Sequence, residues 1–254
     1  MNLTATANTD VGIRKEVNQD SILVKHAQTE REEVMLAVIC DGMGGLSKGE
    51  LASATVIRAF SDWFDWELPK EIEGLSDLRA IGKKWESMLI NLNAQILDYG
   101  KRQHTNLGTT FSGILMVNNS YVIGHVGDSR VYYMGNEICQ LTEDQTVVAK
   151  EVREGRMTPE QAKVDRRRNM LLQCVGASRV VIPQMVYGTV EKGVYLLCSD
   201  GFRNQNTDEE IRNAFGLDKL VDKERMHVVT EAMINQAKDR NERDNISVIL
   251  IKAE

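Results

Sequence analysis

The sequence is short of several features, and each shortage excludes a class of protein. Only 3 prolines occur in 254 residues, without a serine- or glycine-rich tract, so residues 1–254 are predicted to form a single domain. No stretch approaches the roughly 18 apolar residues of a membrane helix, so no membrane span is expected. A net charge of −6 is not the basic excess of nucleic-acid-binding proteins, and no nucleic-acid partner is expected.

Cysteine is also scarce, and its spacing excludes a disulfide framework. The 4 cysteines are far apart, at positions 40, 139, 174 and 198, and form no C-x-x-C pair. Reduced, buried thiols are therefore expected. The first residues lack the basic-then-apolar pattern of a secretion signal, so a cytoplasmic localisation is predicted. Nothing in the sequence specifies an oligomeric state.

Several catalytic motifs are missing as well. There is no G-x-S-x-G, no phosphate-binding P-loop and no C-x5-R loop, which argues against serine hydrolases, P-loop nucleotide hydrolases and cysteine phosphatases. The 4 histidines show no zinc-binding spacing. His125 alternates along a predicted strand, and we expect it to be a hydrogen-bonded core residue.

What the sequence does have is aspartate at the ends of apolar runs, beside glycine or asparagine. Such runs predict buried strands. The aspartates and their runs are Asp41 (34–40), Asp128 (122–126), Asp200 (194–198) and Asp244 (246–251). A single aspartate in this setting is commonly part of a turn. Four in the same setting favour one shared site.

The remaining pattern predicts an α+β fold. Helices are expected over 48–64, 76–101 and 218–238, and strands over 109–117, 121–126, 129–134 and 246–252, with 66–74 as a connection. Tight turns between successive strands favour antiparallel sheets. The charged excursion 144–170 is either a solvated connector or a mobile flap beside the active site. Within it, Thr158 is expected to cap a short helix.

Aspartates brought together would need cations. At about 4 Å and an effective dielectric near 20, each like-charged pair costs about 4 kcal/mol. A converging cluster is therefore either spread out or filled with metal. Oxygen ligands without histidine favour Mg²⁺ or Mn²⁺ over Zn²⁺. Two such ions can activate water and clamp a phosphoryl group, while a nearby Arg or Lys binds phosphate oxygens.

A series of motifs in one order then marks a family. They are Asn18-Gln19-Asp20, Asp41-Gly42-Met43-Gly44-Gly45, Gly49-Glu50, Leu107-Gly108-Thr109-Thr110, Val126-Gly127-Asp128-Ser129-Arg130, Leu141-Thr142-Glu143-Asp144, Cys198-Ser199-Asp200-Gly201 and Asp244-Asn245. This order resembles the bacterial branch of the metal-dependent Ser/Thr protein phosphatases, the PPM or protein phosphatase 2C family. The resemblance covers about residues 8–251.

The resemblance implies a four-layer αββα sandwich, with two antiparallel sheets face to face and helices outside. By motif position, Asp41 would bridge two metal ions, Mn²⁺ or Mg²⁺, and the Gly42 carbonyl would bind one of them. Asp200 and Asp244 would complete the binuclear site. Asp20 would hold a metal-bound water. In this family a bridging hydroxide attacks phosphorus, so these aspartates are the expected catalytic residues.

The resemblance also implies a third metal site and a flap. Asp128, with Asp200, would form the third site found in bacterial members. The flap would lie at about 145–170, in the excursion noted above. The expected partners are phosphoprotein substrates and the Ser/Thr kinase that the enzyme opposes.

Three departures from the family pattern stand out. The phosphate-binding arginine falls at Lys15, which is a point charge without arginine's fork, although Arg14 is adjacent. Met43 stands where eukaryotic members have a histidine. The flap histidines are replaced, in Asp144-Gln145-Thr146 and Asp165-Arg166. No predicted metal ligand is lost.

Two functions follow. One is an active phosphatase for phosphoserine and phosphothreonine in proteins, and the intact set of aspartates favours it. The alternative is a catalytically weak phosphoprotein-binding module, which the Lys15 and flap departures favour. Cys40, beside Asp41, is expected to be a buried strand residue, although its oxidation could disturb the metal loop.

Overall fold

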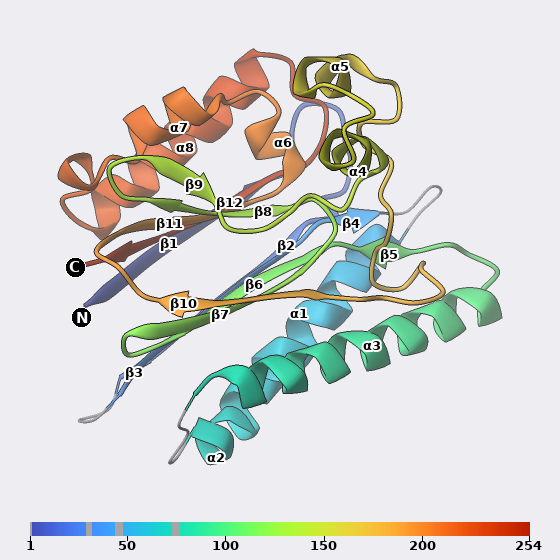
Figure 1. Ribbon diagram of the computed structural model, residues 1–254, viewed down its shortest axis with the longest axis horizontal. Helices are drawn as coiled ribbons and strands as arrows, with labels where there is room; N and C mark the ends of the chain where they lie inside the picture. The colour runs from blue at the N-terminus through green and yellow to red at the C-terminus, as the bar shows by residue number, and fades with distance from the viewer. Residues whose placement is uncertain (1, 29–31, 44–47, 73–76) are drawn as a thin grey trace.

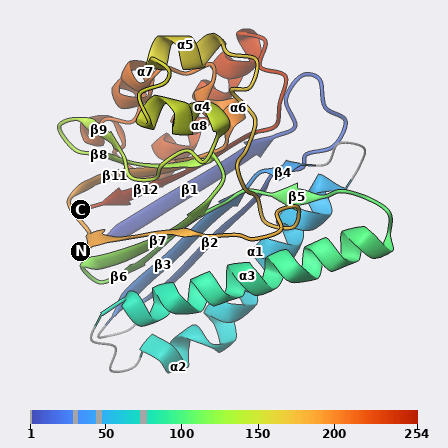
Figure 2. The same cartoon turned by 45° about the vertical axis from the view of Figure 1, so that its right-hand side comes forward.

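A computed structural model describes residues 2–28, 32–43, 48–72 and 77–254 (Figure 1). Two parts of the sequence analysis lie outside these ranges: Gly44 and Gly45 of the Asp41 motif, and the predicted helix start at residue 76. The described chain forms two stacked β-sheets with helices on both outer sides (Figures 1 and 2). The predicted α+β class and the four-layer αββα arrangement are confirmed.

One sheet carries the strand that leads to Asp41. Its strand order is β10-β7-β6-β3-β2, and every pair is antiparallel. The strands are β2 (Ser21–Gln28), β3 (Glu33–Cys40), β6 (Phe111–Val117), β7 (Ser120–Val126) and β10 (Gln184–Thr189).

The other sheet carries the strands beside Asp200 and Asp244. Its order is β1-β12-β11-β8-β9, again antiparallel throughout. The strands are β1 (Leu3–Asp10), β8 (Arg130–Met134), β9 (Ile138–Gln140), β11 (Gly193–Cys198) and β12 (Ile246–Ala253).

The central strands are apolar on both faces because both faces are covered. Along β3, the side chains of Leu36, Val38 and Cys40 join the core beneath the helices. The alternating residues, Met35 and Ala37 among them, pack between the two sheets. Strands β11 and β12 alternate in the same way. This is why the sequence shows continuous apolar runs there and not alternation.

Long helices cover the outer faces. The β3 sheet is covered by α1 (Gly49–Trp66), α2 (Leu68–Ile72) and α3 (Arg79–Arg102), around the aromatic cluster Phe60, Trp63, Trp85 and Phe111. The β12 sheet is covered by α6 (Asp200–Arg203), α7 (Asp208–Ala214) and α8 (Lys223–Asp239). The excursion contains α4 (Val147–Arg153) and α5 (Pro159–Val164), with the predicted Thr158 capping box. None of the described helices is long and apolar enough to cross a membrane.

Some boundaries differ from the prediction for local reasons. Residues 66–74 were expected as a connection, but Leu68 is buried and the short helix α2 forms there. The last helix begins at Lys223 and not at 218, because the Asp222 side chain caps it after a short 3₁₀ turn, Leu217–Lys219. Strand β1 has no long apolar run and was not predicted. Its backbone pairs with β12 along the whole strand.

Candidate active site

The loops at the strand ends bring five aspartates to one site. Asp41 follows β3, Asp128 follows β7, Asp200 opens α6 after β11, Asp244 stands just before β12, and Asp20 just before β2. Burial raises the pKa of Asp41 well above its usual value, and the negative charges of all four other aspartates raise it further. These carboxylates are therefore close enough to act on one another, as the sequence pattern predicts.

Two of the other carboxylates, those of Asp20 and Asp128, are almost fully buried, and their pKa values are also raised. Burial and the charges of Asp200 and Asp244 raise the pKa of Asp20 to about 7, against a short 2.6 Å hydrogen bond from the Ser247 hydroxyl to Oδ2. Burial also raises the pKa of Asp128 to about 7, although the Arg203 guanidinium opposes the shift. Crowded, buried carboxylates of this kind are typical of a cation site or a catalytic site.

The Asp41 loop is held by the Thr109-Thr110 motif. The Asp41 amide donates to Thr110 Oγ1 at 2.9 Å, and its carbonyl accepts from the Thr110 amide and the Thr109 hydroxyl, each at 2.9 Å. The chain continues as β4 (Gly42–Met43), paired with β5 (Gly108–Thr109). Gly42 is needed because a Cβ there would lie 2.3 Å from the Gln19 carbonyl oxygen and 2.4 Å from that of Gly49.

The Asp128 turn is built on the same motif. Gly127 has a φ of +109°, in the region that favours glycine, and a Cβ there would lie 2.6 Å from Thr110 Cγ2. Thr110 also shares a 2.8 Å hydrogen bond with the hydroxyl of Ser129. One threonine thus fixes both the Asp41 and the Asp128 loops.

Asn245 joins the chain ends to the site. Its side-chain oxygen accepts from the Gln19 amide at 2.9 Å, and its nitrogen donates to the Val11 carbonyl at 2.9 Å. Two motifs that are more than two hundred residues apart in the sequence, Asp244-Asn245 and Asn18-Gln19-Asp20, are therefore in direct contact.

Of the two predicted phosphate-binding cations, the structure places Lys15 at the aspartates. Lys15 Nζ lies 3.0 Å from Asp244 Oδ1. Burial lowers the pKa of Lys15, but the attraction of Asp244, Asp41 and Asp200 outweighs this and raises it. Arg14 is exposed, and no hydrogen bond or ion pair joins it to the aspartates among the described residues.

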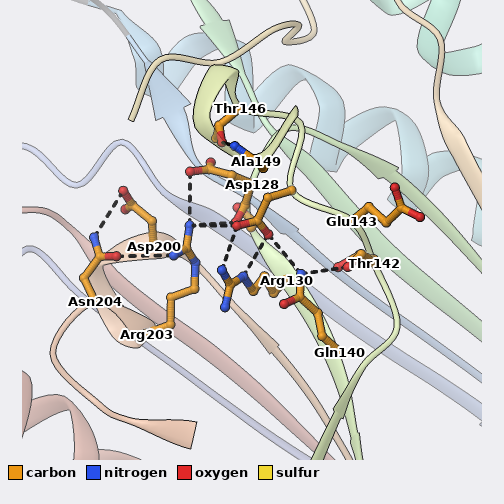
Figure 3. Close-up of polar contacts among 12 residues, drawn as sticks. Asp128, Arg130, Gln140, Thr142, Glu143, Thr146, Ala149, Asp200, Arg203 and Asn204 are labelled. Carbon is orange, nitrogen blue, oxygen red and sulfur yellow. Dashed lines mark hydrogen bonds and ion pairs between the residues drawn. The ribbon is translucent and has the colours of Figure 1, made fainter. Parts of the chain in front are cut away.

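The sequence analysis missed Arg203. In Figure 3 its guanidinium lies between Asp200 and Asp128. Nη2 is 3.2 Å from both the backbone oxygen and Oδ2 of Asp128 and 3.8 Å from Asp144 Oδ2. The only signal in the sequence is a cation three residues after Asp200, on the same helical turn.

A second arginine holds Asp144 at the start of the excursion. Arg130 Nε and Nη2 donate to the two carboxylate oxygens of Asp144 at 2.8 and 2.7 Å (Figure 3). Burial raises the pKa of Asp144, but the hydrogen bonds from Arg130 and the charge of Arg203 bring it below its usual value. Asp144 is therefore a firmly ionised anchor.

Gln145 ties the excursion to the Asp128 turn. Its amide donates to the Gly127 carbonyl, and its Oε1 accepts from the Gly127 amide, both at 2.8 Å. Its carbonyl accepts from the Leu172 amide, and Oε1 also accepts from Gln173 Nε2, again at 2.8 Å. One side chain thus joins the entry and the exit of the excursion to the loop that carries Asp128.

His125 and Cys40 have the core positions that the sequence predicts. His125 is fully buried, its ring nitrogens contact the Ser112 hydroxyl and the Glu143 carbonyl, and burial lowers its pKa to about 4. Cys40 is fully buried, and burial followed by the charges of Asp20 and Asp41 raises the pKa of its thiol well above 9.0. A thiol in this state is a poor nucleophile.

The donors fit hard divalent cations. Every candidate ligand is an oxygen, and Asp20 Oδ1 and Asp200 Oδ1 are buried atoms without a hydrogen-bond partner in the described structure. The side chains are not gathered into a ready coordination sphere: within the described ranges, no three acidic, histidine or cysteine side chains are grouped as a metal site. Asp244 points to Lys15, Asp128 to Arg203 and Asp20 to Ser247.

Comparison with known proteins decides the family. A family model described as protein phosphatase 2C matches residues 12–250. The chain belongs to the protein phosphatase 2C family. Its resemblance to the bacterial Ser/Thr protein phosphatases, predicted from the motifs, is confirmed.

Two relatives of this phosphatase match it along nearly their whole length. Protein phosphatase PhpP of Streptococcus pneumoniae is 31% identical over 251 residues, which cover 96% of this chain and 94% of the relative. The solved structure of serine/threonine phosphatase Stp1 from Staphylococcus aureus superposes with a TM-score of 0.87 at 29% identity, covering 100% of this chain and 96% of that one.

A further solved structure bears on the metal. The catalytic domain of the serine/threonine protein phosphatase PstP, in complex with 2 manganese ions, matches with a TM-score of 0.78 at 30% identity, covering 98% of this phosphatase and 97% of that chain. Members of this fold therefore include an enzyme that binds manganese.

Proposed function

We propose that this phosphatase hydrolyses phosphoserine and phosphothreonine in proteins with the help of a pair of Mn²⁺ or Mg²⁺ ions. Asp41, the Gly42 carbonyl, Asp200 and Asp244 would hold the ions. When bound, such ions activate water as a nucleophile and neutralise the charge of the phosphoryl group. The observation that carries the proposal is the convergence of five crowded aspartates, two of which have a buried oxygen without a hydrogen-bond partner in the described part of the chain.

The protein's own groups would position the reactants. Asp20 is fixed by Ser247, and its Oδ1, which has no hydrogen-bond partner among the described residues, can accept a hydrogen bond from the attacking water. Lys15 is the cation best placed to bind phosphate oxygens, with Arg14 as its exposed neighbour. The excursion at about 145–170 would act as a flap, joined through Gln145 to the Asp128 loop.

The wider role follows from the same chemistry. The substrates would be proteins phosphorylated by a Ser/Thr kinase, which this enzyme would oppose. Its relatives include protein phosphatase PhpP of Streptococcus pneumoniae and serine/threonine phosphatase Stp1 of Staphylococcus aureus. We infer that residues 1–254 act as a single catalytic domain.

The decisive experiment measures phosphate release from a phosphothreonine peptide by the purified chain. It compares Mn²⁺, Mg²⁺ and a chelator for wild type, Asp200→Ala and the exposed control Asp239→Ala. Metal-dependent release that disappears in Asp200→Ala and persists in Asp239→Ala is expected. Folded protein that binds the phosphopeptide without releasing phosphate under any metal would instead support a phosphoprotein-binding module.

A further inference from the structure

Asp128 and Asp200 are the pair that the family resemblance assigns to a third metal ion, and Arg203 lies beside both. We propose that the guanidinium of Arg203 takes the place of that ion, so that the active centre binds two exchangeable divalent cations and carries a third positive centre as a side chain. This rests on the proposed function, because it assumes a metal pair at Asp41, Asp200 and Asp244.

The contacts of Arg203 support this position. Nη2 donates to both the carbonyl and the carboxylate of Asp128 at 3.2 Å, and Nη1 donates to the Asn204 side chain at 3.3 Å. The two charged side chains are shielded: 14% of the Arg203 side chain and 9% of the Asp128 side chain are exposed. The guanidinium is therefore a buried part of the site and not a mobile surface charge.

Of the nearby acids, Asp128 is the one to which Arg203 donates hydrogen bonds. Asp144 is the other nearby acid, but Arg130 already binds both of its carboxylate oxygens. Arg203 lies at the longer distance of 3.8 Å from Asp144. Among these acids, Arg203 therefore gives its hydrogen bonds to Asp128, while its charge also acts on Asp144 and Asp200.

Arginine excludes a metal ion from such a place in a way that lysine or histidine does not. A guanidinium stays charged at any ordinary pH, so it cannot yield Asp128 to a metal by losing its proton. In a shielded site its repulsion of a divalent cation is only weakly screened by solvent. Asp128 is therefore a partner of Arg203 and not a metal ligand, which departs from the role that the family pattern implies.

The test counts bound Mn²⁺ on the full chain, using the electron paramagnetic resonance signal of free Mn²⁺ during titration. Wild type is expected to bind two ions. The single variant Asp128→Asn is expected to bind two as well. Arg203→Ala is expected to bind a third Mn²⁺ ion with lower affinity. The double variant Arg203→Ala/Asp128→Asn is expected to bind only two. Arg212→Ala, an equal loss of charge at an exposed position of α7, is expected to behave as wild type.

The opposite results are equally clear. Three ions in wild type, or the loss of an ion in Asp128→Asn alone, would overturn the proposal without any variant at Arg203. A folded Arg203→Ala chain that still binds two would overturn it as well. If wild type binds no Mn²⁺, the proposed function itself fails, and the role of Arg203 beside a metal pair fails with it.

Discussion

At the scale of single residues, Lys15 stands where the family pattern has an arginine. Its Nζ is 3.0 Å from Asp244 and faces Asp41 and Asp200 as well. A charge-assisted hydrogen bond is worth about 1.5–3 kcal/mol, so Lys15→Ala is expected to lower kcat/KM by about 10- to 100-fold. The same change removes a cation beside Asp244 and should tighten Mn²⁺ binding. Steady-state kinetics and Mn²⁺ titration measure the two effects.

Lys15→Arg and Arg14→Ala are the matched controls. Lys15→Arg is expected to keep activity or raise it, because a guanidinium can grip phosphate with two hydrogen bonds. Arg14→Ala should change little, because that side chain is exposed. A loss in Arg14→Ala as large as in Lys15→Ala would show that the neighbouring arginine binds the phosphate.

His125 ties stability to pH through its buried, neutral ring. Burial lowers its pKa to about 4 in the folded protein, against about 6.5 in the unfolded chain. The neutral ring contributes roughly 3 kcal/mol to the free energy of unfolding. This contribution is fully present above pH 6.5 and is lost as the pH falls toward 4. His125→Asn is therefore expected to remove that part of the pH dependence, as measured by urea unfolding between pH 7 and 4.

The aspartates of the metal-free protein act in the opposite direction. Asp20 and Asp128 have raised pKa values of about 7, so their protonation favours the folded state as the pH falls. They are common to wild type and variant, and the difference between the two curves isolates His125. His104→Asn is the control, since His104 is exposed and its φ of +51° suits asparagine. An equal change of slope in both variants would refute the assignment to His125.

At the scale of elements, Gln145 joins the excursion 144–170 to the Asp128 loop. Gln145→Ala leaves the buried Gly127 amide without its acceptor, which costs about 1–3 kcal/mol. The unfolding free energy is expected to fall by that amount. Amide hydrogens of residues 145–173 should exchange faster, because the entry and exit of the excursion lose their shared contact.

Gln161→Ala is the control, because it alters the interior of the excursion and not the point where the excursion joins the Asp128 loop. Gln161 is exposed and closes the capping box of α5, within the excursion. Its loss should loosen α5 alone and leave exchange at residues 145–146 and 172–173 unchanged. Equal exchange in the two variants would mean that Gln145 has no special role in joining the elements.

At the scale of the whole molecule, metal binding is expected to stabilise the fold. The crowded aspartates come from loops of both sheets, so ions that bind them join the two halves of the sandwich. A ligand at about 100 times its Kd adds about 2.7 kcal/mol, which raises Tm by roughly 5–10 °C for a chain of this size. Calorimetry with Mn²⁺ and after chelation measures the shift.

Variants separate this effect from general binding of Mn²⁺ to an acidic protein. Asp200→Ala should lose most of the rise in Tm, and Asp239→Ala should keep it. A rise of equal size in both would place the stabilising ions elsewhere on the surface.

Several features of this phosphatase could be predicted because their signals are local. An apolar run followed by Asp-Gly marks a buried strand and the carboxylate at its end, whatever lies across the sheet. The Thr158 capping box is contained in four residues and formed as expected. Strand β1, without such a run, could be found only from its pairing with β12.

By itself, the sequence determined the apolar strands, the loop aspartates at their ends and, through the order of motifs, the family. Only the tertiary structure decided which cation serves which aspartate. Lys15 reaches Asp244 across 229 positions of the chain, and Arg203 reaches Asp128 across 75. Such pairings depend on how two sheets stack and on which way a loop side chain turns. No periodicity in the sequence encodes that choice, because it is set by burial and charge in the assembled fold.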